Sequence, residues 1–179
     1  GPVIERLRAA FRTRKHVVCV NKAPLAVAMP PLIELARYNR VQFRFSGTVG
    51  GGTPVLDWAA RCAEGDEVAG VRAILNGTTN YILTRMEEGA SFDAALAEAQ
   101  EKGYAERDPS MDVDGIDTAI KLVIFANAVL GRRAVEDLQH MSAAGFARAV
   151  DRGAACRRAL GRPGANFLEQ AEFERSGSR

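Results

Sequence analysis

The residues best suited to proton transfer and charge recognition lie between Gly103 and Lys121. Asp117 and Lys121 are four positions apart, so they share one face of any helix that contains both. Spacing alone permits an ordinary ion pair, worth roughly 0.2–0.5 kcal/mol, or an acid/base group that acts on a ligand. Residues 122–126 are apolar all round, which indicates burial, and burial beside carboxylates tunes a lysine for proton transfer near neutral pH. The segment also carries five acidic side chains: Glu106, Asp108, Asp112, Asp114 and Asp117.

A divalent metal centre is an alternative that this acidic cluster suggests, but the spacing argues against it. The segment lacks the Asp-x-Asp-x-Asp-Gly series and the closing glutamate of a calcium-binding EF-hand loop. A zinc site is not predicted either, because the chain has two histidines, His16 and His140, and no Cys-x-x-Cys pair. The three cysteines are far apart, so we expect reduced thiols rather than a disulfide framework.

Two further polar motifs follow predicted strands. Asn21 and Lys22 end a β-branched run, at the sheet edge where open α/β sheets bind ligands. Lys22 is then either a point charge for an anion or a solvated residue, and its position alone does not choose. The segment Asn76-Gly77-Thr78-Thr79-Asn80-Tyr81 opens a predicted helix, where Thr78 or Thr79 caps the helix or the free N–H groups hold a carboxylate.

A run of three glycines at 50–52 follows a third predicted strand. Glycine accepts positive φ and lets other groups approach the backbone closely, so the run predicts either a tight turn or a loop that touches a ligand. The chain contains neither a Gly-x-Gly-x-x-Gly turn between a strand and a helix nor a P-loop, so no complete phosphate-binding motif is present in the sequence.

The elements that must position these residues alternate between helices and strands. This order predicts a layered sheet with helices packed on it. A frayed or disordered tail is expected over 161–179, which is rich in Gly, Arg, Glu and Ser. The hydrophobic spacing predicts helices over 3–14, 54–64, 78–88, 91–102, 116–130 and 143–160, a helix opening at Pro30-Pro31, strands over 16–20, 41–45 and 68–75, and a loop over 104–114.

Composition restricts the class of protein. The chain has 179 residues, 47% of them hydrophobic, which suffices for one core. The net charge of +2 and the scattered basic residues, without interleaved aromatics, predict no nucleic-acid partner. No apolar stretch approaches the roughly 20 residues that cross a bilayer, and the start has no secretory apolar region. We therefore expect a cytoplasmic protein without a membrane partner.

Four blocks of this sequence together resemble the homoserine dehydrogenase family, over roughly residues 1–135. The resemblance implies an α+β fold, a mixed sheet covered by helices, with a remnant of a Rossmann α/β domain at the N-terminus. The implied domains are a nucleotide-binding remnant at 1–24, a substrate-binding and dimerisation domain at 25–140 and a divergent helix and tail at 141–179. The blocks are Val17–Ala23, Gly47–Pro54, Asn76–Leu83 and Gly103–Lys121, the last being the longest and most specific.

The resemblance also implies a reaction and a set of residues. The reaction is the NAD(P)-dependent interconversion of L-homoserine and L-aspartate 4-semialdehyde, on the route to threonine and methionine, carried out by a homodimer. Lys121 would be the acid/base group and Lys22 would help polarise the carbonyl, with Asn21 and Lys22 beside the cofactor. Glu106, Asp117 and Asp112 would bind the substrate, the first two through its ammonium group, and Gly77 and Thr78 would line the pocket. Backbone carbonyls of Val49 and Gly51 would hold a monovalent cation.

Two departures from the family pattern shape the alternatives. The glycine-rich nucleotide turn is absent, so we expect this chain to lack most of the dinucleotide-binding half. Ser46 stands where many relatives carry a glutamate beside the cation loop, and it leaves room for a related dehydrogenase of another small aldehyde. The principal alternative is a truncated, catalytically incompetent fragment that acts at most as a dimerising substrate domain.

Overall fold

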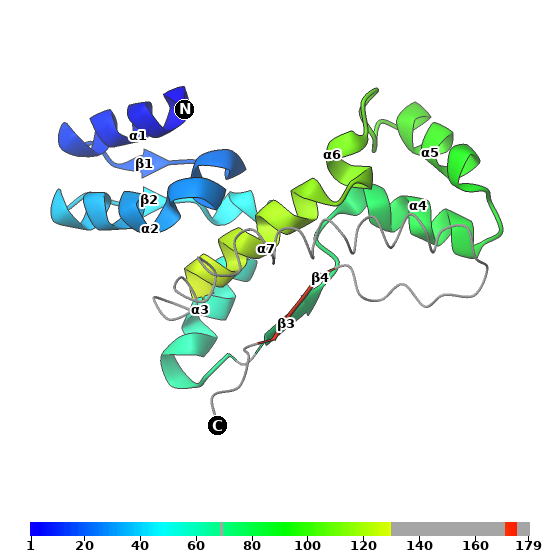
Figure 1. Cartoon of the computed structure of the whole chain (residues 1–179). Coiled ribbons are helices and arrows are strands. Elements are labelled where there is room, and N and C mark those ends of the chain that lie inside the picture. Colours follow the sequence, from blue (N-terminus) through cyan, green and yellow to red (C-terminus); the bar gives the residue numbers. More distant parts are fainter. Residues whose placement is uncertain (69, 130–170, 175–179) are drawn as a thin grey trace. The chain divides into compact units, whose positions relative to one another are not determined.

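The computed structural model describes residues 1–68, 70–129 and 171–174 (Figure 1). The described chain divides into two compact units, one with residues 1–68 and 120–129 and the other with residues 70–119 and 171–174. Each unit has a hydrophobic core of its own. Helix α7 (Ile116–Val129) contributes residues to both.

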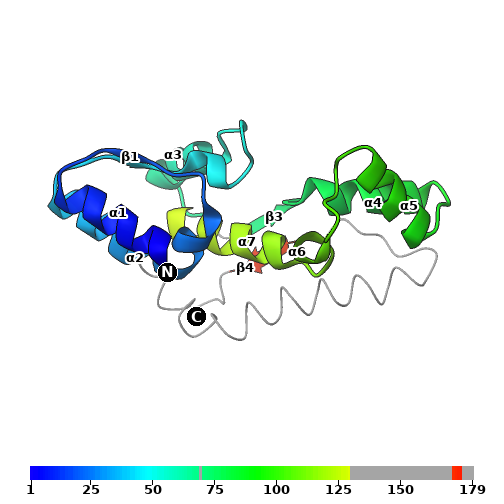
Figure 2. The same ribbon diagram turned by 90° about the horizontal axis from the view of Figure 1, so that it is seen from above.

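The first unit is built on a pair of parallel strands, β1 (Val17–Val18) and β2 (Phe43–Arg44), with Val17 opposite Phe43. Helices α1 (Pro2–Arg12) and α2 (Lys22–Tyr38) lie together on one side of this pair (Figure 2). Val18 of β1 is 80% exposed. The buried residues between helices and strands are Leu7, Phe11, Cys19, Leu32 and Ala36, and the Phe11 ring meets the Phe43 ring edge-on at 5.1 Å.

Helix α2 is longer than its sequence predicts. It begins at Lys22, and the prolines that mark the expected start lie beyond a kink at Ala28, where φ is −142° and ψ is 27°. Proline fits the first turn of a helix because that turn has no use for its missing N–H. The kink places Pro30 and Pro31 in the first turn of the second segment, so the predicted start there is correct for that segment. The segment from Lys22 to the kink was not predicted.

The glycine run after β2 forms a turn that needs glycine. Gly50 and Gly51 have φ values of +83° and +58°. A Cβ on Gly50 would also lie 3.0 Å from the Thr53 carbonyl oxygen and 3.0 Å from the Val55 side chain. Conformation and space therefore both require glycine at position 50. The turn joins the short 3-10 helix η1 (Ser46–Thr48) to helix α3 (Val55–Gly65).

The second unit pairs strand β3 (Gly70–Ala73) with β4 (Ala171–Glu174) in antiparallel register. Helices α4 (Gly77–Glu87) and α5 (Phe92–Glu101) pack side by side (Figure 1) around Ile82, Ala95, Ala99 and Ala105. The short helix α6 (Ser110–Val113) interrupts the segment predicted as a loop over 104–114. Strand β4 lies in the stretch expected to be a disordered tail, and a strand is what the structure has at those four residues.

These observations decide part of the fold prediction. The described chain is mostly helical with small sheets, which agrees with helices packed on strands. Within the described residues the strands form two separate two-stranded sheets, one parallel and one antiparallel, rather than the single mixed sheet expected. The Rossmann remnant at 1–24 and the three-part domain division stay predictions, and the expected helix over 143–160 lies outside the described residues. No helix of the described part is long and apolar enough to span a membrane.

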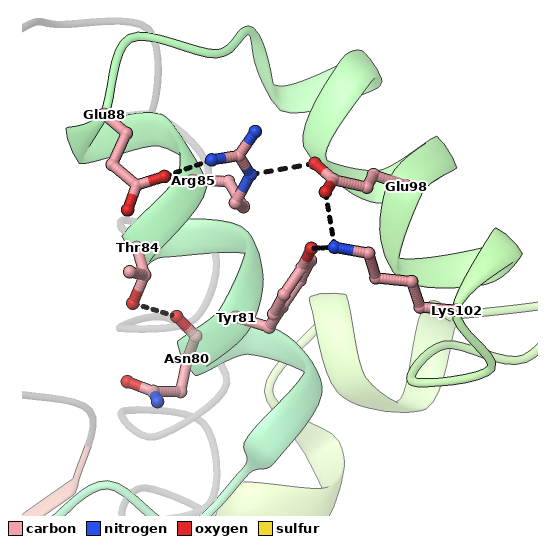
Figure 3. Close-up of polar contacts among 7 residues, drawn as sticks. All are labelled: Asn80, Tyr81, Thr84, Arg85, Glu88, Glu98 and Lys102. Atoms are coloured by element: carbon pink, nitrogen blue, oxygen red, sulfur yellow. Dashed lines mark hydrogen bonds and ion pairs between the residues drawn. The ribbon is translucent and has the colours of Figure 1, made fainter.

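A polar network joins α4 to α5 on their exposed side (Figure 3). The Arg85 Nε donates to a Glu98 carboxylate oxygen at 2.8 Å, and Arg85 also pairs with Glu88. The Lys102 ammonium donates to the other Glu98 oxygen at 2.7 Å and to the Tyr81 hydroxyl at 2.8 Å. Hydrogen bonds from Lys102 and Arg85 lower the pKa of Glu98 to about 2, and the bond to Glu98 raises the pKa of Lys102 above its usual range.

Two helices end on an arginine in the left-handed conformation. Arg14 and Arg40 both have φ of 57°. At the end of α2, the Arg40 N–H donates to the Arg37 carbonyl at 3.0 Å and the Val41 N–H donates to the Ala36 carbonyl at 3.0 Å. This is the Schellman pattern, in which glycine is the favoured residue because a Cβ is strained there. An arginine at each of these positions therefore makes the helix end less stable than a glycine would.

Arg40→Gly is expected to stabilise the protein. Removing the strain of the left-handed backbone raises the free energy of unfolding by about 1–2 kcal/mol. The greater freedom of glycine in the unfolded chain lowers it by about 0.5–1 kcal/mol. The Tm should rise by about 1–4 °C in a thermal melt followed by circular dichroism. Arg37→Gly, inside α2, is the control and should lower the Tm. A lower Tm for Arg40→Gly would contradict this account.

The Glu98 network predicts a pH-dependent contribution to stability. Because the folded pKa of Glu98 lies below its unfolded value, the contribution is present above about pH 4.5 and is lost as the pH falls through about 2. We expect the difference in unfolding free energy between wild type and Glu98→Gln to shrink between pH 4.5 and pH 2. Urea unfolding across this window measures it, and a constant difference would show that the network contributes nothing through ionisation.

Candidate functional site

The candidate site of the second unit is organised by Asn76, which stands between β3 and α4. Its backbone is extended, and its side-chain oxygen accepts a hydrogen bond from the Thr79 N–H at 2.9 Å and one from the Thr79 hydroxyl at 3.1 Å. Asn76 is therefore the N-cap of α4. The sequence-based assignment of the cap to Thr78 or Thr79 is wrong, because both residues lie inside the helix.

The same Asn76 side chain binds two carboxylates. Its Nδ2 donates to Asp112 Oδ1 at 2.6 Å and to Asp117 Oδ2 at 3.0 Å. Asn76 is 4% exposed and Asp117 is 5% exposed, so the second bond is buried. Hydrogen bonds to ionised carboxylates are stronger than neutral ones, and burial increases their effect. One amide thus satisfies a helix cap with its oxygen and holds two acidic side chains with its nitrogen.

A sharp turn brings the two carboxylates to this amide. Asp112 belongs to α6 and Asp117 to the first turn of α7, and Gly115 between them has φ of +77°. The Gly115 N–H donates to the Asp112 carbonyl at 3.0 Å, which closes α6 before α7 begins. At the other end of α6, the Asp108 side chain accepts from the Ser110 N–H at 3.2 Å, and hydrogen bonds from Ser110 lower the pKa of Asp108.

The loop after α5 is joined to the start of α4. The Thr78 hydroxyl donates to the Tyr104 carbonyl at 2.8 Å, and Thr78 is itself buried. The Gln100 side chain donates to the Glu106 carbonyl at 3.0 Å, so the loop backbone is held from two sides. The Glu106 side chain is exposed, and its carboxylate has no hydrogen-bond or ion-pair partner among the described residues.

Gly77, the first residue of α4, leaves its surroundings open. A Cβ there would meet nothing within 4 Å, and its φ is not positive. Neither packing nor backbone conformation in this structure requires glycine at position 77.

The acidic side chains of this region suit an organic cation such as an ammonium group. Two carboxylates are held on Asn76, and a third, on Glu106, has no partner among the described residues and lies in a loop bonded to the same helix. A ligand ammonium group forms charge-assisted hydrogen bonds with carboxylates of this kind. Within the described ranges no group of three or more His, Cys, Asp or Glu side chains is arranged to hold a metal ion.

The remaining predicted site residues lie in the first unit. Asn21 caps α2, its side-chain oxygen accepting from the Ala23 N–H at 3.1 Å, and Lys22 is the first residue of that helix. Lys121 lies on α7, partly buried, one turn after Asp117. Val49 is fully buried at the end of η1, and Gly51 lies in the exposed glycine turn.

Two residues with clear roles were not among the predicted site residues. Asn76 was noted only as part of its motif, although an asparagine directly before a helix start is a strong N-cap signal. Asp57, on α3, accepts a hydrogen bond from the Ser46 hydroxyl at 2.7 Å, and the sequence gives no signal for this contact across eleven positions.

Comparison with known proteins identifies the family. The homoserine dehydrogenase family model matches residues 54–162, which include Asn76, Glu106, Asp112, Asp117 and Lys121. The chain belongs to the homoserine dehydrogenase family. It is 46% identical over 140 residues to homoserine dehydrogenase from Methanocaldococcus jannaschii, covering 77% of this chain and 42% of that protein. It is also 45% identical to the NAD(+)-dependent homoserine dehydrogenase of Pseudomonas canavaninivorans, over 72% of this chain and 37% of that one.

A solved structure of the homoserine dehydrogenase family supports the same conclusion. A hyperthermophilic archaeal homoserine dehydrogenase in complex with NADPH superposes with a TM-score of 0.68 at 34% identity, covering 72% of this chain and 40% of that one. The resemblance stated from the sequence is therefore confirmed. The chain spans between 31% and 42% of the length of the curated relatives it matches.

Asn76→Asp tests whether the amide holds the two carboxylates. Aspartate is an equally good N-cap, so the substitution keeps the cap and removes only the two donor bonds. A third carboxylate then faces Asp112 and Asp117, and we expect unfolding free energy to fall by roughly 2–4 kcal/mol at pH 7. Urea unfolding at pH 7 measures this.

The matched control is Asn80→Asp, one turn further along α4, where the side chain is exposed. That variant adds the same charge to the same helix without removing a donor bond. Equal destabilisation of the two variants would show that charge on α4, rather than the Asn76 amide, decides the result.

Proposed function

We propose that this protein serves the interconversion of L-homoserine and L-aspartate 4-semialdehyde with NAD(P). The observation that carries the proposal is the pair of carboxylates held on Asn76, next in sequence to an open glycine, in the part of the chain that matches the family model. Glu106, whose carboxylate has no partner among the described residues, lies in the loop that is bonded to α4. Two relatives, an NAD(+)-dependent homoserine dehydrogenase and one solved in complex with NADPH, support the cofactor.

The acidic groups suit a substrate that carries an α-ammonium group. In the proposal, Glu106 and Asp117 accept hydrogen bonds from this ammonium, and Asp112 adds negative charge at the same place. Asp117 is buried and held in place, so its orientation is set before a ligand arrives. Gly77 and Thr78 line the pocket, where the absence of a side chain at 77 lets the substrate approach the start of α4.

Lys121 is proposed to move the proton. NAD(P) supplies or takes up the hydride at the carbon atom that is oxidised or reduced. In the direction of reduction, the Lys121 ammonium donates a proton to the carbonyl oxygen of the semialdehyde, and in the direction of oxidation its neutral amine accepts the hydroxyl proton of homoserine. The buried residues Ile124, Phe125 and Ala126 continue the same helix and keep its core face dry.

Asn21 and Lys22 are proposed to lie beside the cofactor, with Lys22 also polarising the substrate carbonyl. They follow a parallel strand at its carboxyl end, the edge at which open α/β sheets bind nucleotides. The Asn21 side-chain oxygen already accepts the hydrogen bond that caps α2. In the proposal, Asn21 therefore contacts the cofactor through its backbone rather than through this oxygen.

The proposal extends to cellular context and assembly. We propose a cytoplasmic homodimer that acts in threonine and methionine biosynthesis, and a monovalent cation held by the backbone carbonyls of Val49 and Gly51. Support for the cation comes from the turn itself, where Gly51 has positive φ and a Cβ on it would meet nothing within 4 Å. The Ser46–Asp57 hydrogen bond places a carboxylate next to the residue that replaces the glutamate of many relatives.

Lys121→Ala is expected to lower kcat for homoserine oxidation by roughly 100- to 10,000-fold, because general acid/base catalysis contributes about that much. Binding of NADH or NADPH, measured by fluorescence titration, should be unchanged. Lys15→Gln, at an exposed position outside the proposed site, is the control and should keep wild-type turnover.

Two results would overturn the proposal. Near-wild-type turnover by the Lys121→Ala variant would remove Lys121 from its role. A folded wild-type chain that binds neither NADH nor NADPH, and turns over no homoserine, would contradict the assignment of this activity to the chain.

A further inference from the structure

We propose that Tyr81 and Lys102 are positioning residues that brace the loop Gly103–Glu106 and so set the affinity of the site for its amino-acid substrate. The affinity part of this inference rests on the proposed function, because it takes Glu106 as a group that binds the substrate ammonium. The bracing part rests on the contacts of the second unit alone.

The brace begins with Lys102, the residue at the C-terminal end of α5. Its ammonium donates to the Tyr81 hydroxyl at 2.8 Å and to Glu98 at 2.7 Å, while Glu98 is also held by Arg85 (Figure 3). The ammonium nitrogen lies 5.3 Å from the centroid of the Tyr81 ring. Both the hydroxyl and the ring of Tyr81 are therefore fixed by one side chain.

Tyr81 passes this constraint to the loop. Its ring centroid lies 4.9 Å from that of Tyr104, at 52° between the ring planes, a geometry typical of favourable aromatic pairs. Tyr104 is 57% exposed, so the Tyr81 ring is a substantial part of what holds its side chain. The Tyr104 carbonyl accepts from Thr78 at 2.8 Å, which makes Tyr104 the link between the loop and the start of α4.

The loop itself has reason to need a brace. It leaves α5 through Gly103, whose φ is +75°, with the Gly103 and Tyr104 N–H groups donating to the Gln100 and Ala99 carbonyls at 3.1 and 2.8 Å. Beyond that turn it carries Glu106, whose carboxylate has no partner among the described residues. A free carboxylate binds a cation well only when its backbone is already ordered, since ordering on binding costs affinity.

The contact between the two helices does not depend on this brace. Ile82, Ala95 and Ala99 already form a buried core between α4 and α5, and the Arg85–Glu98 bond crosses between them separately. Exposed polar pairs contribute little to global stability. Loss of the Tyr81 hydroxyl or of the Lys102 ammonium should thus alter the loop and ligand affinity while leaving the Tm nearly unchanged.

The test compares Tyr81→Leu, Tyr81→Phe and Lys102→Met with Thr84→Ala. Thr84 is also on α4 but lies on the side turned away from α5, and among the described residues its hydroxyl bonds to the carbonyl of Asn80 in its own helix, so its loss leaves the brace intact (Figure 3). The readouts are amide hydrogen exchange at Tyr104, Ala105 and Glu106 by NMR, thermal melting, and kcat and KM for homoserine.

Tyr81→Leu should speed exchange at these three amides and raise KM about three- to tenfold, the worth of one aromatic pair, with kcat within about twofold of wild type. Tyr81→Phe and Lys102→Met, which keep the ring, should give smaller changes in the same direction. Thr84→Ala should match wild type in all readouts.

Unchanged exchange in Tyr81→Leu, or a rise in KM equal to that of Thr84→Ala, would overturn the bracing role. If Tyr81→Leu does not fold, the two ring-preserving variants decide the question through the same amides. Wild type without homoserine turnover, but with faster exchange in the variants, would sink the proposed function and the affinity claim while leaving the brace established.

Discussion

The bonds from the Asn76 amide to Asp112 and Asp117 are the interaction on which the second unit depends. Two carboxylates directed at one point repel each other, and one of these, Asp117, is removed from water. An asparagine side chain resolves this without adding charge, because its nitrogen has two donors and its oxygen remains free to cap α4. Among uncharged side chains, only asparagine and the longer glutamine supply two donors and an acceptor from one planar group.

This interaction explains the local shape of the chain around it. Asp112 and Asp117 are close in sequence, yet a continuous helix would place residues five apart on different faces. The chain therefore breaks the helix at Gly115 and starts α7 afresh, so that both carboxylates reach the same nitrogen. Short helix α6 and the turn at Gly115 are consequences of a polar constraint rather than of hydrophobic packing, since α6 buries no residue fully.

The difference between polar and apolar constraints also explains what the sequence could predict. Helices α1, α3, α4, α5 and α7 follow hydrophobic spacing and obvious caps, such as Ser91 before α5, and their bounds agree with expectation within two residues. Helix α6 was missed because its signal is a set of side-chain bonds, and the start of α2 because two prolines outweigh the cap at Asn21. The partnership of Asn76 with Asp117 spans forty-one positions, and no local pattern encodes such a bond.

Candidate site residues were predicted through the family resemblance more than through spacing. The spacing of Asp117 and Lys121, four apart, favoured an ordinary ion pair over a catalytic group, and the catalytic role of Lys121 came from the resemblance. To this the structure adds the burial of Asp117 and its bond to Asn76. Because α7 is continuous from Ile116 to Val129, fixing Asp117 in its first turn also fixes the backbone of Lys121 one turn later. A lysine has a long flexible stem, so a firmly placed backbone is what limits the positions its amine can reach. The Asn76 amide therefore helps to order the backbone of Lys121 when the protein folds, before any ligand binds.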